Sequence, residues 1–181
     1  MPYYARRRPY YNRRRSYRRY GSKRQVNKYI KNVVGAFQSN ASTSSEVITV
    51  FGGTNASESI ATGTMQGLRW DIDIANTNTG PSRAFWAIVI VREGYAPNSL
   101  NIGNNANLYT PEQDVLAYGV ATMTASTSES GPSIEAFHDT TKSMRKVQQG
   151  DRLMLLFAAD TTTPVASDTT INATLQFFVK Q

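Results

Sequence analysis

The chain has 181 residues, with 20 Lys and Arg against 13 Asp and Glu, a formal net charge of +7, and no cysteine. The lack of cysteine excludes a disulfide framework and thiolate metal sites, and it fits a reducing compartment. No apolar run approaches the roughly 18 residues of a membrane span, and the N-terminus lacks the apolar stretch of a secretory signal. We therefore expect no membrane insertion.

The first 31 residues form a strongly basic segment. They hold twelve of the Lys and Arg residues, seven of the ten Tyr residues and no acid. The remaining residues have eight basic against thirteen acidic side chains, which is a charge of −5. Such asymmetry is typical of an arm that binds nucleic acid or a membrane surface, attached to an ordinary domain.

Residues 1–24 favour nucleic acid as the partner of this arm. Guanidinium groups match phosphate oxygens two at a time, and Tyr rings stack on unpaired bases without sequence preference. The segment has almost no aliphatic side chains for a membrane face, and Pro2 and Pro9 disfavour the amphipathic helix of a mitochondrial presequence. A targeting signal alone and an inert solubilising tail remain the alternatives. The nucleic-acid-binding residues that we expect are Arg6, Arg7, Arg8, Arg13, Arg14, Arg15, Arg18, Arg19, Lys23, Arg24, Tyr10, Tyr11, Tyr17 and Tyr20.

Residues 25–45 are predicted to form a short amphipathic helix followed by a polar linker. The apolar side chains recur at i, i+3, i+4, i+7, i+8 and i+11, which is the spacing of one helical face. A helix of about three turns is marginal by itself, so we expect it to pack on the following domain. The residues of the apolar face are Val26, Tyr29, Ile30, Val33, Val34 and Phe37.

Residues 46–181 are predicted to form one all-β domain. Eight short segments rich in β-branched and aromatic residues alternate with turns rich in Gly, Asn, Pro and Ser, and no long amphipathic helix follows residue 37. This pattern predicts an eight-stranded antiparallel jelly-roll sandwich. The expected strands are residues 46–51, 66–75, 83–92, 115–123, 134–137, 142–147, 152–157 and 170–179.

Two of these strands predict how the core is built. Residues 68–74 alternate strictly between apolar and polar side chains, and residues 83–92 form the nearly continuous apolar run of a strand covered on both faces. Phe85 and Trp86 are adjacent, so at most one belongs to the principal core. We favour core positions for Trp70 and Trp86 over stacking on nucleic-acid bases.

The sequence contains no constellation typical of an enzyme. His138 is the only histidine, so a two-histidine metal site is impossible, and neither a G-x-S-x-G elbow nor a Walker A sequence is present. Asp71 and Asp73 share one strand face and suggest an ion site, but a solvated or interfacial polar face explains them better. We expect no enzyme activity, no cofactor and no bound metal. Arg145, Lys146 and Arg152 flank a Gly-Asp turn, where a charged strand edge is favoured over a second phosphate contact.

Three segments resemble the capsid proteins of small circular single-stranded DNA viruses, the circoviruses and their circovirus-like relatives. They are MPYYARRRPYYNRRRSYRRY at residues 1–20, SMRKVQQGDRLMLLF at residues 143–157, and TINATLQFFVKQ at the C-terminal end. The resemblance implies a T=1 shell of 60 copies, with arms facing inward on single-stranded DNA, or on RNA in recombinant particles. It also implies a location in the virion and in the host nucleus, with the basic clusters serving as a nuclear localisation signal. Host import receptors and attachment factors are further candidate partners.

Three other interpretations stay open. A capsid protein of a small RNA virus or satellite virus shares every feature except the sugar of the cargo. A cellular nucleic-acid-binding β-domain with a basic tail, such as a ribosomal protein, usually spreads basic charge over the body, whereas this body is acidic. A β-sandwich enzyme or lectin with an import tag is the third.

Overall fold

A computed structural model describes residues 26–37, 45–52, 60, 62–77, 80, 82–97, 100, 113–126, 131–142, 144–161 and 169–181. These residues contain nine strands and no helix, hence no helix able to cross a membrane. The strands are β1 (Val26–Phe37), β2 (Ser45–Phe51), β3 (Gly63–Asn76), β4 (Ser82–Val91), β5 (Gln113–Met123), β6 (Ser133–Thr141), β7 (Arg145–Val147), β8 (Arg152–Thr161) and β9 (Thr169–Lys180).

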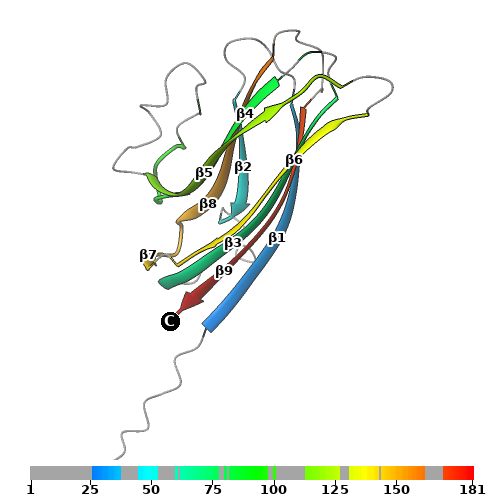
Figure 1. Cartoon of the computed structure of the whole chain (residues 1–181). Coiled ribbons are helices and arrows are strands. Elements are labelled where there is room, and N and C mark those ends of the chain that lie inside the picture. Colours follow the sequence, from blue (N-terminus) through cyan, green and yellow to red (C-terminus); the bar gives the residue numbers. More distant parts are fainter. Residues whose placement is uncertain are drawn as a thin grey trace, which may run out of the picture.

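The strands form two antiparallel sheets (Figure 1). The first sheet has the order β1-β9-β3-β6, with the short β7 paired to the start of β3. The second has the order β2-β8-β4-β5. With β7 set aside, the eight long strands are shared equally between the sheets, and the chain crosses between them in the manner of a jelly roll. The predicted all-β jelly-roll class is confirmed, and each of the eight predicted strands coincides with an observed one.

The predicted helix at the start of the domain is wrong. Residues 26–37 form β1, which pairs antiparallel with β9 along its whole length. The apolar spacing fits a helical face, but the segment is also rich in Val and Ile, which favour strands. Its long-range pairing with β9 replaces the local hydrogen bonds of a helix. Residues 25–45 are therefore not a separate unit, because β1 is the first strand of the sandwich; residues 38–44 lie outside the described residues.

The change from helix to strand alters which side chains of β1 are buried. In a helix, Tyr29 and Ile30 share one face, whereas in a strand adjacent side chains point to opposite faces. Tyr29 stacks on Phe177 of β9, with ring centroids 4.7 Å apart, while Ile30 is 54% exposed on the outer face of the first sheet. Val26 and Val34 are exposed on that face as well.

The principal core lies between the sheets and follows the predicted alternation. Leu68, Trp70, Ile72 and Ile74 are buried, whereas the polar residues between them lie on the outer face. The central strand β4 is buried on both faces from Trp86 to its end, as its apolar run predicts. Its second face belongs to a smaller apolar cluster made of Ala87, Val89, Val91, Leu100, Met154, Leu156 and Ala158.

The two long sides of the sandwich differ. On the side of β1 and β2, three aromatic rings close the gap between the sheets, because Phe51 lies edge-on to both Tyr29 and Phe177. On the side of β5 and β6, the two strands are the edges of their sheets and leave a groove between them. The domain therefore has one closed side and one open side.

Candidate nucleic-acid interface

The fourteen arm residues predicted to bind nucleic acid all lie within residues 1–25, outside the described part of the chain. The structure does describe the point where this segment joins the domain. Val26 opens β1 and pairs with Lys180, the last residue of β9. The arm is thus attached at one end of the first sheet, beside the C-terminal end of the chain (Figure 1).

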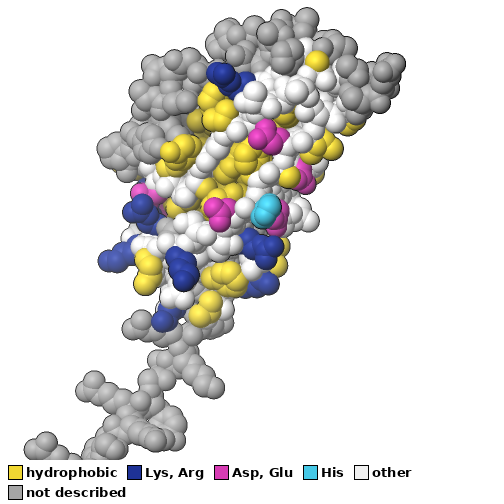
Figure 2. Space-filling model, in the orientation of Figure 1, with side chains coloured by type: hydrophobic (Ala, Val, Ile, Leu, Met, Phe, Trp, Pro, Cys, Tyr) yellow, Lys and Arg dark blue, Asp and Glu magenta, His cyan; other side chains and the backbone are white. Residues whose placement is uncertain are grey.

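Strand pairing brings three lysines from distant segments to this end. Lys180 lies opposite Thr64 of β3, and Thr64 lies opposite Lys146 of β7. Neighbouring strands are about 4.8 Å apart, so the backbones of Lys146 and Lys180 are roughly 10 Å apart on the same face. Lys28 shares that face, because it lies two residues after Val26. We call Lys28, Lys146 and Lys180 the basic end; in Figure 2, Lys and Arg side chains gather at this part of the molecule.

The middle of the same outer face is acidic instead. Asp71 and Asp73 project from β3, and Asp71 lies opposite the exposed His138 of β6. The Nε atom of Arg69 lies 3.8 Å from Asp71 Oδ2, and both side chains are about half exposed. The described residues contain no group of three or more His, Cys, Asp and Glu side chains placed to hold a metal ion. Phosphate is therefore attracted to the basic end and repelled by the middle of the sheet.

The Gly-Asp turn beside the basic end is held by a buried carboxylate. Asp151 is 2% exposed, and its Oδ2 atom accepts hydrogen bonds from Arg92 Nη1 at 2.7 Å and from the Gln148 N–H at 2.9 Å. Arg92 also donates through Nη2 to Asp114 Oδ2, at 2.6 Å, and through Nη1 to the Lys146 carbonyl, at 2.9 Å. These bonds fix β7, and with it Lys146, against the start of β5. Gly150 has a φ of +100°, a conformation that favours glycine.

The three basic residues that flank this turn have different surroundings. Arg145 and Lys146 are exposed on β7. The guanidinium group of Arg152, in contrast, donates to the backbone carbonyl of Tyr95. Lys146 and Arg145 are thus available to a phosphate, whereas Arg152 already has a structural partner.

The aromatic residues considered as base-stacking platforms belong to the domain's interior. Trp70 is 7% and Trp86 is 3% exposed, and both lie in the principal core cluster. Phe85 packs on the smaller cluster at the other face of β4. The expectation that at most one of Phe85 and Trp86 belongs to the principal core is confirmed.

Sequence reasoning missed Lys180 altogether and placed Lys28 on a helix. The signal that unites them with Lys146 is strand register, which depends on pairings across more than 100 residues. Only a correct strand assignment for residues 26–37, together with the register of β9 on β3, brings the three lysines to one face.

Comparisons with known proteins give a similarity of structure alone. No protein family and no curated sequence matches the chain. Among solved structures, a chain of Desmodium yellow mottle tymovirus has 11% identity and a TM-score of 0.45, over 89% of this chain and 90% of that one. A turnip yellow mosaic virus chain has 15% identity and a TM-score of 0.37, over 89% of this chain and 84% of that one. The VP2 subviral particle of infectious bursal disease virus has 11% sequence identity and a TM-score of 0.39, over 88% of this chain but only 33% of that one. With TM-scores below 0.5, these similarities leave the function to be argued from the chain itself.

Proposed function

We propose that this chain is a viral capsid protein whose jelly-roll domains assemble into a closed shell around single-stranded DNA held by the basic arms. The observation that carries the proposal is the separation of charge along one short chain. Residues 1–25 hold ten basic and no acidic residues, and they are joined to the first strand of an acidic jelly roll, beside Lys28, Lys146 and Lys180. Jelly rolls occur in viral capsid and lectin domains, and a polycationic arm suits the first of these roles.

In this proposal the arm binds the cargo, and the domain forms the shell. Arginine arms repel one another until phosphate neutralises them, so assembly is coupled to the cargo. The acidic middle of the first sheet repels the genome weakly and confines it to the arms and the basic end. The T=1 geometry with 60 copies, the DNA cargo and a role of the arginine clusters in nuclear import come from the resemblance to circovirus-like capsid proteins.

Electron microscopy of the purified protein, combined with absorbance at 260 and 280 nm, tests this function. Uniform closed particles with excess absorbance at 260 nm are expected. A monodisperse monomer or dimer that forms no particles after addition of single-stranded DNA would overturn the capsid function and leave a basic-tailed binding domain.

The nucleic acid inside the particles decides between this proposal and its nearest rival, an RNA-virus or satellite capsid protein. Particles from infected tissue, treated with nuclease before extraction, are expected to yield circular single-stranded DNA. Protected RNA in those particles would favour the rival. Recombinant particles do not answer this question, since the arm has no expected sequence preference.

A further inference from the structure

The open side of the sandwich is a groove with an aromatic floor. Trp86 of β4 lies between Trp70 of β3 and Phe137 of β6, with ring centroids 6.3 Å and 5.5 Å away. Two adjoining hollows of about 440 and 450 Å³ lie above these rings and share Trp70, Tyr118 and Asp139 in their walls. We call this feature the β5/β6 groove. No Lys or Arg is among the described residues that line it, which disfavours nucleic acid as its ligand.

The groove is closed at one end and open along the rest of its length. The Thr122 N–H of β5 donates to Glu135 Oε2 of β6 at 2.8 Å and bridges the two strands at the closed end. From residue 136 to residue 141, β6 lines the open part over about 20 Å, the length of a six-residue strand. Both strands are sheet edges there, so the groove has the proportions of an extended polypeptide rather than of a compact ligand.

The indole of Trp86 packs closely under β5 and carries a buried donor. The Nε1 atom of Trp86 has no hydrogen-bond partner among the described residues, although the side chain is only 3% exposed. Gly119, opposite Trp86 on β5, leaves room for the indole, because a Cβ atom there would lie 2.6–2.7 Å from the ring. A buried indole N–H usually finds a partner, and leaving it unpaired costs free energy. Since the Nε1 atom is itself covered, the indole offers the occupant of the groove an apolar ring surface and not a hydrogen-bond donor.

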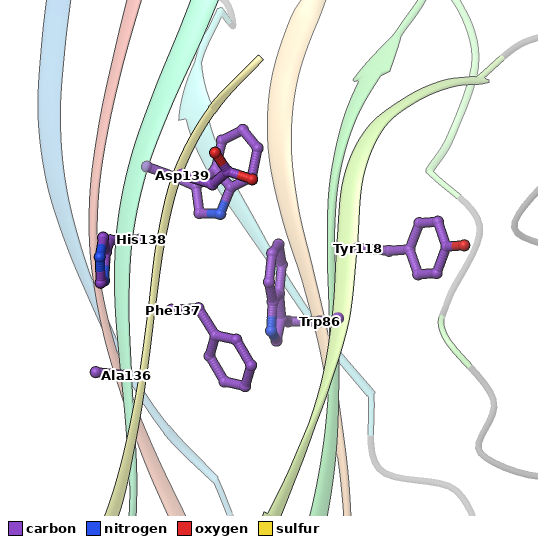
Figure 3. Close-up of a pocket in the computed structure, with 8 residues that line it drawn as sticks. Trp86, Tyr118, Ala136, Phe137, His138 and Asp139 are labelled. Atoms are coloured by element: carbon purple, nitrogen blue, oxygen red, sulfur yellow. The ribbon is translucent and has the colours of Figure 1, made fainter.

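The groove also has an acidic wall. In Figure 3, Phe137 and Asp139 point from β6 to the groove side, whereas Ala136 and His138 point to the other side of the strand. Asp139 pairs with Trp70 and is exposed. An inward-pointing charge on an edge strand prevents indiscriminate strand pairing, and it selects a partner that carries the opposite charge.

The opposite side of the domain carries a surface with matching properties. The outer face of β1 exposes Val26 by 50%, Ile30 by 54% and Val34 by 75%, with Lys28 and Asn32 between them. Ile30 and Val34 are about 13 Å apart along the strand, so both fit within the open length of the groove. Lys28 carries the positive charge that complements the negative charge of Asp139, and both side chains are exposed.

We propose that the β5/β6 groove binds the exposed outer face of β1 from a second copy of this chain, which names the subunit contact on which the proposed shell rests. Because the two surfaces lie on opposite sides of one domain, the contact is head-to-tail, and its repetition gives rings if the rotation between copies closes and open filaments if it does not. The apolar side chains of β1 and the aromatic floor of the groove exclude water from the contact. Lys28 and Asp139 fix the position of β1 along the groove.

A charge exchange tests this contact in the full-length protein, with its arms neutralised by a saturating short single-stranded oligonucleotide, at about 0.15 M salt, where a partly buried pair is only partly screened. Lys28→Asp and Asp139→Lys alone are each expected to raise the concentration for half-association, measured by sedimentation, by at least about tenfold. The double variant should return to within about threefold of the wild type. Glu93→Lys is the matched control, because it makes the same charge change at an exposed residue after β4 that belongs to neither surface, and it should behave like the wild type.

A mixing experiment tests the head-to-tail geometry. Ile30→Asp/Val34→Asp removes the apolar row of β1, and Asp139→Lys blocks the groove, so each protein alone should remain monomeric. Each still has the surface that the other lacks, and a mixture should give a 1:1 dimer and nothing larger.

The outcomes separate this contact from the capsid function. Single variants that associate and form nucleic-acid-filled particles like the wild type would overturn the contact and leave the shell intact. A 1:1 mixed dimer from a protein that never encloses nucleic acid would support the contact and overturn the shell. Failure of the mixture to dimerise, with both variants folded by circular dichroism, would also overturn the contact.

Discussion

The two sides of the sandwich differ in closure, charge and the interaction they suit. The β1/β2 side is closed by Tyr29, Phe51 and Phe177, and the basic arm joins the domain there, at the start of β1. The β5/β6 side is open, aromatic and acidic. A symmetrical domain would present similar surfaces to its neighbours and to its cargo. Here the arm and the groove differ in their response to salt, which weakens binding by the arm strongly and binding by an apolar groove only slightly.

The largest expected effect comes from removing the charge of the arm. With twelve basic residues, the slope of log affinity for single-stranded DNA against log salt should be about −8; changing Arg6, Arg7, Arg8, Arg13, Arg14, Arg15, Arg18 and Arg19 to Gln leaves four and should reduce the slope to about −3. Affinity near 0.15 M salt should fall by at least about 100-fold, measured by fluorescence anisotropy.

A control variant with Lys at the same eight positions separates the effect of positive charge from that of the guanidinium group. Lysine keeps the phosphate contacts but loses the bidentate fork and the stacking surface of arginine. The slope should remain near −8, with a smaller loss of affinity. A slope shallower than about −2 for the wild type would contradict the polycation mechanism altogether.

Stability should distinguish the closed side from the open side. Phe177→Ala removes a 1% exposed ring from the aromatic seal and should lower the free energy of unfolding by about 3–5 kcal/mol. Phe137→Ala, at the half-buried groove wall, should cost only about 1–2 kcal/mol, because part of that ring already contacts water. Denaturant unfolding measures both values, and equal losses would show that the two sides are equally packed.

A smaller effect is expected at the buried carboxylate that supports the basic end. Asp151→Asn removes the charge that faces Arg92 and should destabilise the domain by about 2–3 kcal/mol. Asp114→Asn, at the 29% exposed partner of the same guanidinium, should cost less than about 1 kcal/mol. Thermal melts of the two variants test this order, and the reverse order would contradict a central role for Asp151.

The sequence alone predicted the strands correctly where the hydrophobic pattern is compatible with only one type of secondary structure. The alternation of residues 68–74 and the apolar run of residues 83–92 are compatible with strands only, and both were placed correctly. The segment at residues 26–37 fits both a helical face and a β-branched strand, and its pairing with the distant β9 decides between them. Local pattern cannot contain that information.

The basic end and the β5/β6 groove also depend on strand register, whereas the arm does not. The arm was found from composition, because its charge and its tyrosines need no fold to be recognised. The basic end and the β5/β6 groove arise where Lys28, Lys146 and Lys180 share a face and where Gly119 lies opposite Trp86. No spacing in the sequence joins these residues before the sheets are assembled.

The smallest expected effect is at the basic end itself. Changing Lys146 and Lys180 to Gln, with Lys28 kept because the subunit contact uses it, removes two charges from a face that already lies beside the arm, so the salt slope should become shallower by about 1.4. Affinity for single-stranded DNA should fall only a fewfold, far less than in the arm variant, because residues 1–31 keep all twelve of their basic side chains. A matched variant with Arg69 and Arg83 changed to Gln has the same net charge but an intact basic end. If both variants shift the slope equally, only net charge matters; if the first alone shifts it, phosphate contacts this end of the first sheet, as strand pairing indicates.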